Sequence, residues 1–260
     1  IIGPIIGGQL GAIDLRLPFW FAAGLALLNF LYGVFVLPES LPKERRTAKF
    51  DWSHANPVGS MVLLKRYPQV FGLAAVVLIA NLAHYVYPSV FVLFAEYQYR
   101  WNEQQVAWVL AAVGVCSVIV QAGLVGRVVP KFGERRTLLF GLACGVVGFC
   151  IYGMADLGWM FLIGLPISAL WGLAGPATQA LITQQVGADV QGRVQGALMS
   201  LVSLAGIVGP MMFAGTFALF IGKAAPAHLP GAPWLLAALL LAIGWLVGWR
   251  FARPPSAAAH

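Results

Sequence analysis

Seven long apolar runs, separated by polar links, dominate this chain of 260 residues. They cover residues 17–37, 70–94, 105–126, 137–155, 159–183, 195–221 and 234–251. A helix that crosses a lipid bilayer needs about 20 consecutive, mostly apolar residues. Only 10% of the residues are charged, whereas a soluble domain carries about 25%, and the mean hydropathy is +0.83. The sequence therefore predicts an all-α, polytopic transmembrane helix bundle whose surface contacts the lipid bilayer.

Lysine and arginine gather in alternate links, beginning with the link after residue 37 and ending with the C-terminal tail. Thirteen of the sixteen basic residues lie there: Lys43, Arg45, Arg46, Lys49, Lys65, Arg66, Arg127, Lys131, Arg135, Arg136, Arg193, Arg250 and Arg253. By the positive-inside rule, the linker 38–69 and the C-terminus are expected in the cytoplasm. The net charge of +7 is thus a topology signal in short loops, and no nucleic-acid partner is expected.

A string of glycine and proline occurs twice in the chain. It opens the sequence as Gly3-Pro4-x-x-Gly7-Gly8 and returns as Gly206, Gly209 and Pro210. Repeats of six helices are typical of a large class of secondary transporters. Because the chain opens inside an apolar segment, we expect that the helices before it are missing from this sequence. The repeat then predicts three parts: the end of helix five and helix six in 1–37, a central linker in 38–69, and a C-terminal six-helix bundle in 70–260.

Five motifs carry a family resemblance. They are Gly3-Pro4-x-x-Gly7-Gly8, Val36-Leu37-Pro38-Glu39-Ser40, Gly133-Glu134-Arg135-Arg136, Gly175-Pro176-Ala177-x-Gln179-Ala180 and Gln191-Gly192-x-x-Gln195-Gly196. In their order and spacing, the chain resembles the major facilitator superfamily and, within it, the drug:proton antiporters of the tetracycline-resistance type. The match extends from the end of helix five through helix twelve, which is essentially the whole sequence.

The resemblance implies a function and a setting. It implies a multi-pass protein of the bacterial inner membrane that exports a hydrophobic, drug-like compound, such as a tetracycline, by alternating access. A proton is the implied coupling ion, and no other cofactor is expected. The implied partners are the small-molecule substrate and the missing N-terminal helices of the same protein.

The repeated string resembles the antiporter motif of helix five in that group. Glycines spaced three or four apart clear one helix face and let a neighbouring helix approach closely. Proline removes a backbone donor and bends the helix. These features predict kinked, tightly packed helices, although ordinary glycine-rich packing is an alternative. The motif and packing residues are Gly3, Pro4, Gly7, Gly8, Gly206, Gly209 and Pro210.

The link around residues 127–136 resembles a degraded copy of the superfamily's cytoplasmic loop motif, in which an acid and a base clamp the inward gate. Pro130 stands where the acid is expected. The basic side chains can still pair with carboxylates or with helix C-termini across the gate, and topology anchoring is an equal alternative. The predicted gate-loop residues are Arg127, Lys131, Gly133, Arg135 and Arg136.

The central thirds of helices seven to twelve hold no Asp, Glu, Lys or Arg. Ionisable groups inside a membrane usually mark proton or ion pathways. Proton coupling is therefore expected mainly in the missing helices. Tetracycline exporters usually carry an acid in helix nine, at the position of Gly145 here. This departure from the resemblance argues against a metal-chelated tetracycline as the substrate, but not against export itself. No metal site is expected.

Polar residues inside the apolar runs are the candidates for a substrate cavity. Asn81, His84 and Tyr85 share one helix face by their spacing, and His84 titrates near neutral pH. Hydrogen bonding between helices explains such residues about equally well. The predicted cavity residues are Asn81, His84, Tyr85, Gln121, Trp171 and Gln179. Trp159, Trp234 and Trp249 fall near helix ends, which is typical of interfacial aromatic belts.

Two other functions are compatible with parts of this sequence. A facilitator or symporter for a small metabolite keeps the fold, and a receptor or scaffold keeps only the membrane bundle. An enzyme is not expected, because the sequence has neither a His-Glu-x-x-His string nor a phosphate-binding loop ending in Gly-Lys-Ser/Thr. Cys116, Cys144 and Cys150 lie within apolar runs and are interpreted as small buried hydrophobic residues.

Overall fold

The computed structural model of the chain describes residues 6–7, 10–11, 13–14, 16–37, 67–187, 190–222 and 227–252. The chain divides into two compact units, Ile1–Trp52 and Ser53–His260. Residues 38–66 of the predicted linker lie outside the described residues. The linker and the three-part organisation therefore stay predictions.

The first unit contributes one long helix, α2 (Leu17–Phe35). Pro18 stands in its first turn, where the missing backbone N–H has no helical partner to lose. The helix has no buried residue, and the side chains of Phe19 and Phe35 are more than three quarters exposed. A 19-residue helix with exposed apolar side chains is suited to a lipid environment.

The described residues of the second unit form six membrane-length spans. They are formed by α4 (Pro68–His84) with α5 (Val86–Tyr99); α6 (Glu103–Val118) with the π-helical η3 (Ile119–Leu124) and α7 (Val125–Phe132); α8 (Glu134–Met154); α9 (Gly158–Ala169) with the 3₁₀-helical η4 (Leu170–Leu173) and α10 (Ala174–Thr183); α11 (Gln191–Ile221); and α12 (Ala232–Phe251). With α2 they make seven helices that are long and apolar enough to cross a membrane in the described part of the chain. The predicted all-α transmembrane fold is confirmed.

Local chemistry explains where the spans begin and end. Asn102 accepts a hydrogen bond from the backbone N–H of Gln105, whose side chain accepts from the N–H of Asn102, so a capping box starts α6. Arg100 ends α5 in the left-handed conformation, with φ of 57°. Gly133 separates α7 from α8 with φ of 79°, which glycine adopts without a steric penalty. The helices therefore include polar residues that flank the apolar runs of the sequence.

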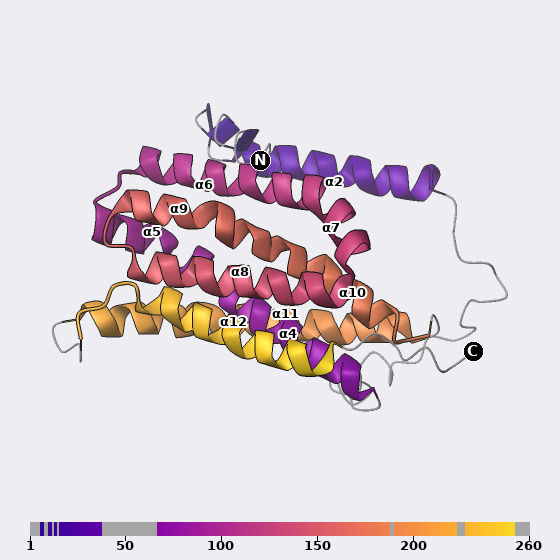
Figure 1. Cartoon of the computed structure of the whole chain (residues 1–260). Coiled ribbons are helices and arrows are strands. Elements are labelled where there is room, and N and C mark those ends of the chain that lie inside the picture. The colour runs from indigo at the N-terminus through magenta and orange to yellow at the C-terminus, as the bar shows by residue number, and fades with distance from the viewer. Residues whose placement is uncertain are drawn as a thin grey trace. The chain divides into compact units, whose positions relative to one another are not determined.

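The helices of the second unit pack in a definite order (Figure 1). α12 packs against both α4 and α8, and α8 packs in turn against α9, η4 and α10. α6 packs against α9, whereas α11 packs against α4 and α5. The packing order is thus α6, α9, α8, α12, α4 and α11. The helices α6 and α11 lie at its two ends, because they share no extensive contact with each other.

Aromatic rings fill the core between α5, α8, α9 and α12. Tyr152 and Phe161 stack with ring centroids 4.1 Å apart, and Trp234 lies 5.1 Å from both Tyr87 and Tyr152. Trp234 is completely buried, so it departs from the expected interfacial belt, whereas Trp159 and Trp249 are mostly exposed. The start of α12 is buried because Gly231 approaches the backbone of Gly153 at the end of α8.

Three spans are irregular near their middle. Tyr85 separates α4 from α5, where Pro88 lacks the N–H that would bond the carbonyl of His84. The second span passes through the π-helical η3, and the fourth passes through η4 shortly after Pro166. Such irregular turns inside helices frequently lie at functional sites. Each of these breaks lies beside or contains a predicted cavity residue, namely His84, Gln121 or Trp171.

Candidate substrate cavity

A cavity of about 670 Å³ lies in the second unit between the helices at the ends of the packing order. Its walls come from α4 and α5, from α6 with η3, from η4 with α10, and from α11. Leu142 of α8, a buried core residue, also contributes to the lining. The volume falls within the range of about 300–1,000 Å³ that is usual for small-molecule sites.

Five of the six predicted cavity residues line this space: Asn81, His84, Gln121, Trp171 and Gln179. The fold brings them together from three spans, although Asn81 and Gln179 are far apart in the sequence. The cavity also holds polar residues that were not among the predicted six, namely Tyr87, Ser117, Thr178 and Gln195. Helical spacing gave a signal for two of them, because Tyr87 follows His84 by three residues and Ser117 precedes Gln121 by four.

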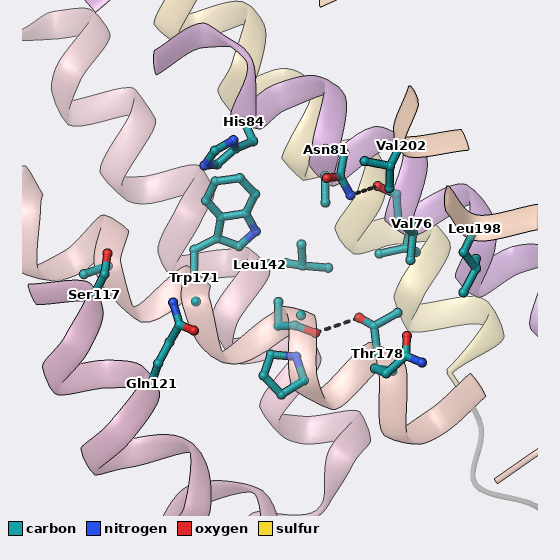
Figure 2. A pocket seen from close by; sticks show the side chains of 18 of the residues that line it. Val76, Asn81, His84, Ser117, Gln121, Leu142, Trp171, Thr178, Leu198 and Val202 are labelled. Atoms are coloured by element: carbon teal, nitrogen blue, oxygen red, sulfur yellow. Dashed lines mark hydrogen bonds between the residues drawn. The ribbon is translucent and has the colours of Figure 1, made fainter. Parts of the chain in front are cut away.

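His84 and Trp171 form the aromatic side of the cavity (Figure 2). Their ring centroids lie 5.8 Å apart with the planes tilted by 47°. The indole of Trp171 also meets the buried ring of Phe149 edge-on at 5.5 Å, and the imidazole of His84 lies 6.0 Å from Tyr87. Edge-on and tilted contacts of this kind hold aromatic rings in defined orientations.

Amides and hydroxyls form the polar part of the lining. The side-chain amide of Asn81 donates to the carbonyl of Val77 at 2.8 Å, and the hydroxyl of Thr178 donates to the carbonyl of Ala174 at 2.7 Å. Those two donors are therefore engaged within their own helices. Ser117 and Gln121 extend from α6 and η3 on the side facing Trp171 (Figure 2). Large apolar walls with a few placed polar groups suit amphipathic ligands.

Tyr85 lies elsewhere. It does not belong to the cavity lining, and its side chain packs against the glycines of α11. A Cβ added to Gly206 would approach the Tyr85 hydroxyl to 2.7 Å, and one added to Gly209 would approach the Tyr85 Cβ to 2.6 Å. Of the shared helix face inferred from spacing, only Asn81 and His84 point to the cavity, because the break between α4 and α5 falls at Tyr85.

Gly145 of α8 packs against the aromatic side of the cavity. A Cβ at this position would lie 2.7 Å from Leu241 Cδ1 and 3.0 Å from Trp171 Cγ. Both distances are shorter than an ordinary van der Waals contact. The indole of Trp171 therefore occupies the space into which any side chain at position 145 would extend.

The predicted gate-loop residues lie at the junction of α7 and α8. Arg135 donates from Nη2 to the carbonyl of Trp249 at 3.1 Å, which joins the start of α8 to the last turn of α12. A cation is favourable at a helix C-terminus, where carbonyl groups lack helical partners. Arg127 donates to the carbonyl of Gly123 within its own span, Lys131 lies 5.5 Å from the Phe132 ring, and Arg136 is exposed. Their role in a gate stays a prediction.

Several predicted residues are not part of the described structure. Gly3, Pro4 and Gly8 lie outside the described residues. Gly7 is helical, and among the described residues no atom lies within 4 Å of its added Cβ. Cys116, Cys144 and Cys150 are free thiols. Among the residues that the structure describes, no group of three or more His, Cys, Asp or Glu is placed to hold a metal ion.

Comparison with known protein families decides the identity of the fold. The sequence profile of the Major Facilitator Superfamily matches residues 1–210, which is most of the chain. The chain belongs to this superfamily. The resemblance inferred from the five motifs is thus confirmed, and the seven membrane-length helices are those of a multi-pass membrane protein.

The chain is also similar to individual curated proteins. Tetracycline resistance protein, class C, of Escherichia coli is 34% identical over 240 residues, covering 92% of this chain and 59% of the relative. Tetracycline resistance protein, class G, of Vibrio anguillarum is 34% identical over 246 residues, covering 94% of this chain and 60% of the relative. Hippocampus abundant transcript 1 protein of Homo sapiens is 27% identical over 225 residues, covering 85% and 46%. The chain therefore spans about three fifths of the tetracycline resistance proteins that it matches.

A solved structure agrees with this assignment. The crystal structure of the human organic anion transporter MFSD10 (TETRAN) matches with a TM-score of 0.80 at 20% sequence identity. The match covers 95% of this chain and 59% of that chain. At this identity the likeness establishes the shared fold of the superfamily.

Proposed function

We propose that the complete protein containing this chain is a secondary active transporter that exports amphipathic, drug-like compounds, such as tetracyclines, across the cytoplasmic membrane of bacteria. Transport is driven by protons and proceeds by alternating access. The chain contributes helix six and the C-terminal bundle, and the cavity of that bundle forms one half of the substrate site.

The observation that carries this proposal is the composition of the cavity. One aromatic side, formed by His84 and Trp171, faces side-chain amides such as Gln121 across a space of about 670 Å³. A planar, amphipathic ligand matches such walls, since its rings stack on aromatic side chains while its polar edge bonds to amides. The similarity to tetracycline resistance proteins supports an exporter of such compounds.

The position of the cavity supports alternating access. Residues of α6 and α11, the two ends of the packing order, both line the cavity, and a second bundle would complete the site between them. Transporters built from repeated bundles place the substrate at the interface of the repeats and rock one bundle against the other. Arg135 keeps the cytoplasmic ends of α8 and α12 together, which suits a bundle that moves as one body.

Drug susceptibility of bacterial cells tests this proposal. Cells that lack their own drug exporters and express the complete protein should survive higher concentrations of tetracycline than cells carrying an empty vector. The Trp171→Ala and Gln121→Ala variants should lose most of this protection, because both residues line the cavity. Trp159→Ala is the matched control, since Trp159 is mostly exposed and lies outside the cavity.

Two outcomes would count against the proposal. The first is equal susceptibility to tetracycline and to other amphipathic drugs with and without the complete protein. The second is protection that survives Trp171→Ala and Gln121→Ala but disappears in Trp159→Ala, which would place the substrate away from the cavity.

A further inference from the structure

Three hydroxyl groups meet inside the apolar core next to the cavity. The hydroxyl of Tyr152 lies 2.5 Å from Ser168 Oγ, and the hydroxyl of Tyr87 lies 3.5 Å from each of them. The three residues come from different helices, α5, α8 and α9. Tyr152 and Ser168 are buried, whereas the ring of Tyr87 lines the cavity. A polar cluster in this position is costly unless its members bond to one another.

Two glycines make this meeting possible. A Cβ on Gly148 of α8 would approach Ser168 Cβ to 2.6 Å, and a Cβ on Gly164 of α9 would approach the ring of Tyr152 to 2.7 Å. Each helix thus offers a glycine opposite the hydroxyl-bearing residue of its partner. This close packing of α8 against α9 brings the two buried hydroxyls into contact.

The directions of the hydrogen bonds follow from the donors available. Ser168 donates to the carbonyl of Leu165 at 3.0 Å, and a serine has only one O–H. Tyr152 therefore donates to Ser168, and Tyr87 donates its single O–H toward Tyr152 or Ser168, both at 3.5 Å. The hydrogen bonds therefore lead from Tyr87, which lines the cavity, into the core and end on the backbone carbonyl of Leu165 in α9.

We propose that Tyr152 and Ser168 are positioning residues: they hold the ring of Tyr87 in one orientation and thereby set the affinity of the cavity for its ligand without touching that ligand. Tyr87 lies 6.0 Å from His84, so a rotation of its ring changes the surface next to the aromatic side of the site. The effect on affinity depends on the proposed transport function. The orientation of the ring does not.

Two measurements on the complete protein test the inference. Tyr87 is replaced by 3-fluorotyrosine, and its fluorine resonance is recorded without ligand in the wild type, Ser168→Ala and Tyr152→Phe. The KM and maximal rate of tetracycline transport are then measured in proteoliposomes for the unlabelled proteins. Both variants should give a shifted or split resonance and a KM raised by roughly 2- to 10-fold, with a nearly unchanged maximal rate. Tyr99→Phe is the matched control, because its hydroxyl donates to Ala155 at 2.8 Å and it does not line the cavity.

Each result decides a separate part of the inference. An unchanged fluorine resonance in both variants would show that packing alone holds the ring of Tyr87. A shifted resonance with an unchanged KM would show that the orientation of the ring does not set the affinity for the ligand. A Tyr99→Phe variant with the same shift in KM would make the effect general rather than specific. Absence of tetracycline transport by the wild type would refute the proposed function, while the fluorine resonance would still decide whether the two hydroxyls position Tyr87.

Discussion

Gly145 packs against Trp171 so closely that a Cβ added to Gly145 would stand 3.0 Å from Cγ of the indole. The two residues belong to different spans, in α8 and η4, and their contact positions the indole that lines the cavity. Position 145 is also the one at which, by the resemblance described above, tetracycline exporters carry an acidic residue. In this chain, the space for such a side chain is filled by Trp171 and Leu241.

Replacement of Gly145 by alanine should therefore weaken ligand binding. The added methyl group has to displace Trp171 or Leu241, and overpacking of this kind costs about 1–3 kcal/mol. We expect a higher KM for tetracycline and a lower unfolding temperature in detergent. Gly126→Ala is the control, because no atom lies within 4 Å of its added Cβ. Equal behaviour of the two variants would contradict the role of Gly145 as the support of Trp171.

Tyr85 and Gly209 should behave as a coupled pair in stability measurements. Gly209→Ala places a Cβ at 2.6 Å from the Cβ of Tyr85, so it should destabilise the protein by about 1–3 kcal/mol. A Tyr85→Gly background lacks both the Cβ and the ring that would clash, so the second substitution should cost less there. Thermal unfolding of the two single variants and the double variant gives the coupling energy. Additive effects would show that the two residues do not pack against each other.

His84 should influence which compounds are transported and at which pH. Its imidazole faces the cavity beside Trp171 and is the predicted titratable group of these spans near neutral pH. His84→Ala in the complete protein should change the drug-resistance profile or move the pH optimum of transport. His228→Ala is a suitable control, since His228 lies outside the cavity and is exposed. A profile and optimum identical to the wild type would assign His84 to packing alone.

Hydropathy was sufficient for the transmembrane fold, because a bilayer leaves few alternatives to long apolar helices. The positions of Asn81, His84, Gln121, Trp171 and Gln179 in one cavity also followed from a simple premise. Polar residues in apolar spans tend to face one another or a water-filled space rather than lipid.

The remaining features depend on contacts between distant segments. The break at Tyr85 turns its ring toward Gly206 and Gly209, and no helical spacing rule anticipates such a break. Trp234 lies near a helix end in the sequence but is buried by close packing of Gly231 against Gly153. The hydroxyl cluster of Tyr152 and Ser168 joins two helices that only the tertiary structure brings together.

Topology can be tested with single cysteines. The native thiols Cys116, Cys144 and Cys150 are first replaced by serine, and either Lys49→Cys or Gln104→Cys is added. By the positive-inside rule, a membrane-impermeant maleimide should label position 104 in intact cells and position 49 only in inverted membrane vesicles. Labelling of position 49 from the outside would reverse the orientation and the assignment of the linker to the cytoplasm.

The most direct test of the central claim is uptake of tetracycline into inverted membrane vesicles that contain the complete protein. When respiration acidifies the vesicle interior, an exporter of this orientation should accumulate the drug with saturation kinetics. A protonophore should abolish the accumulation, and Trp171→Ala should reduce it strongly. Accumulation equal to that of vesicles without the protein, or accumulation insensitive to the protonophore, would contradict proton-driven export through this cavity.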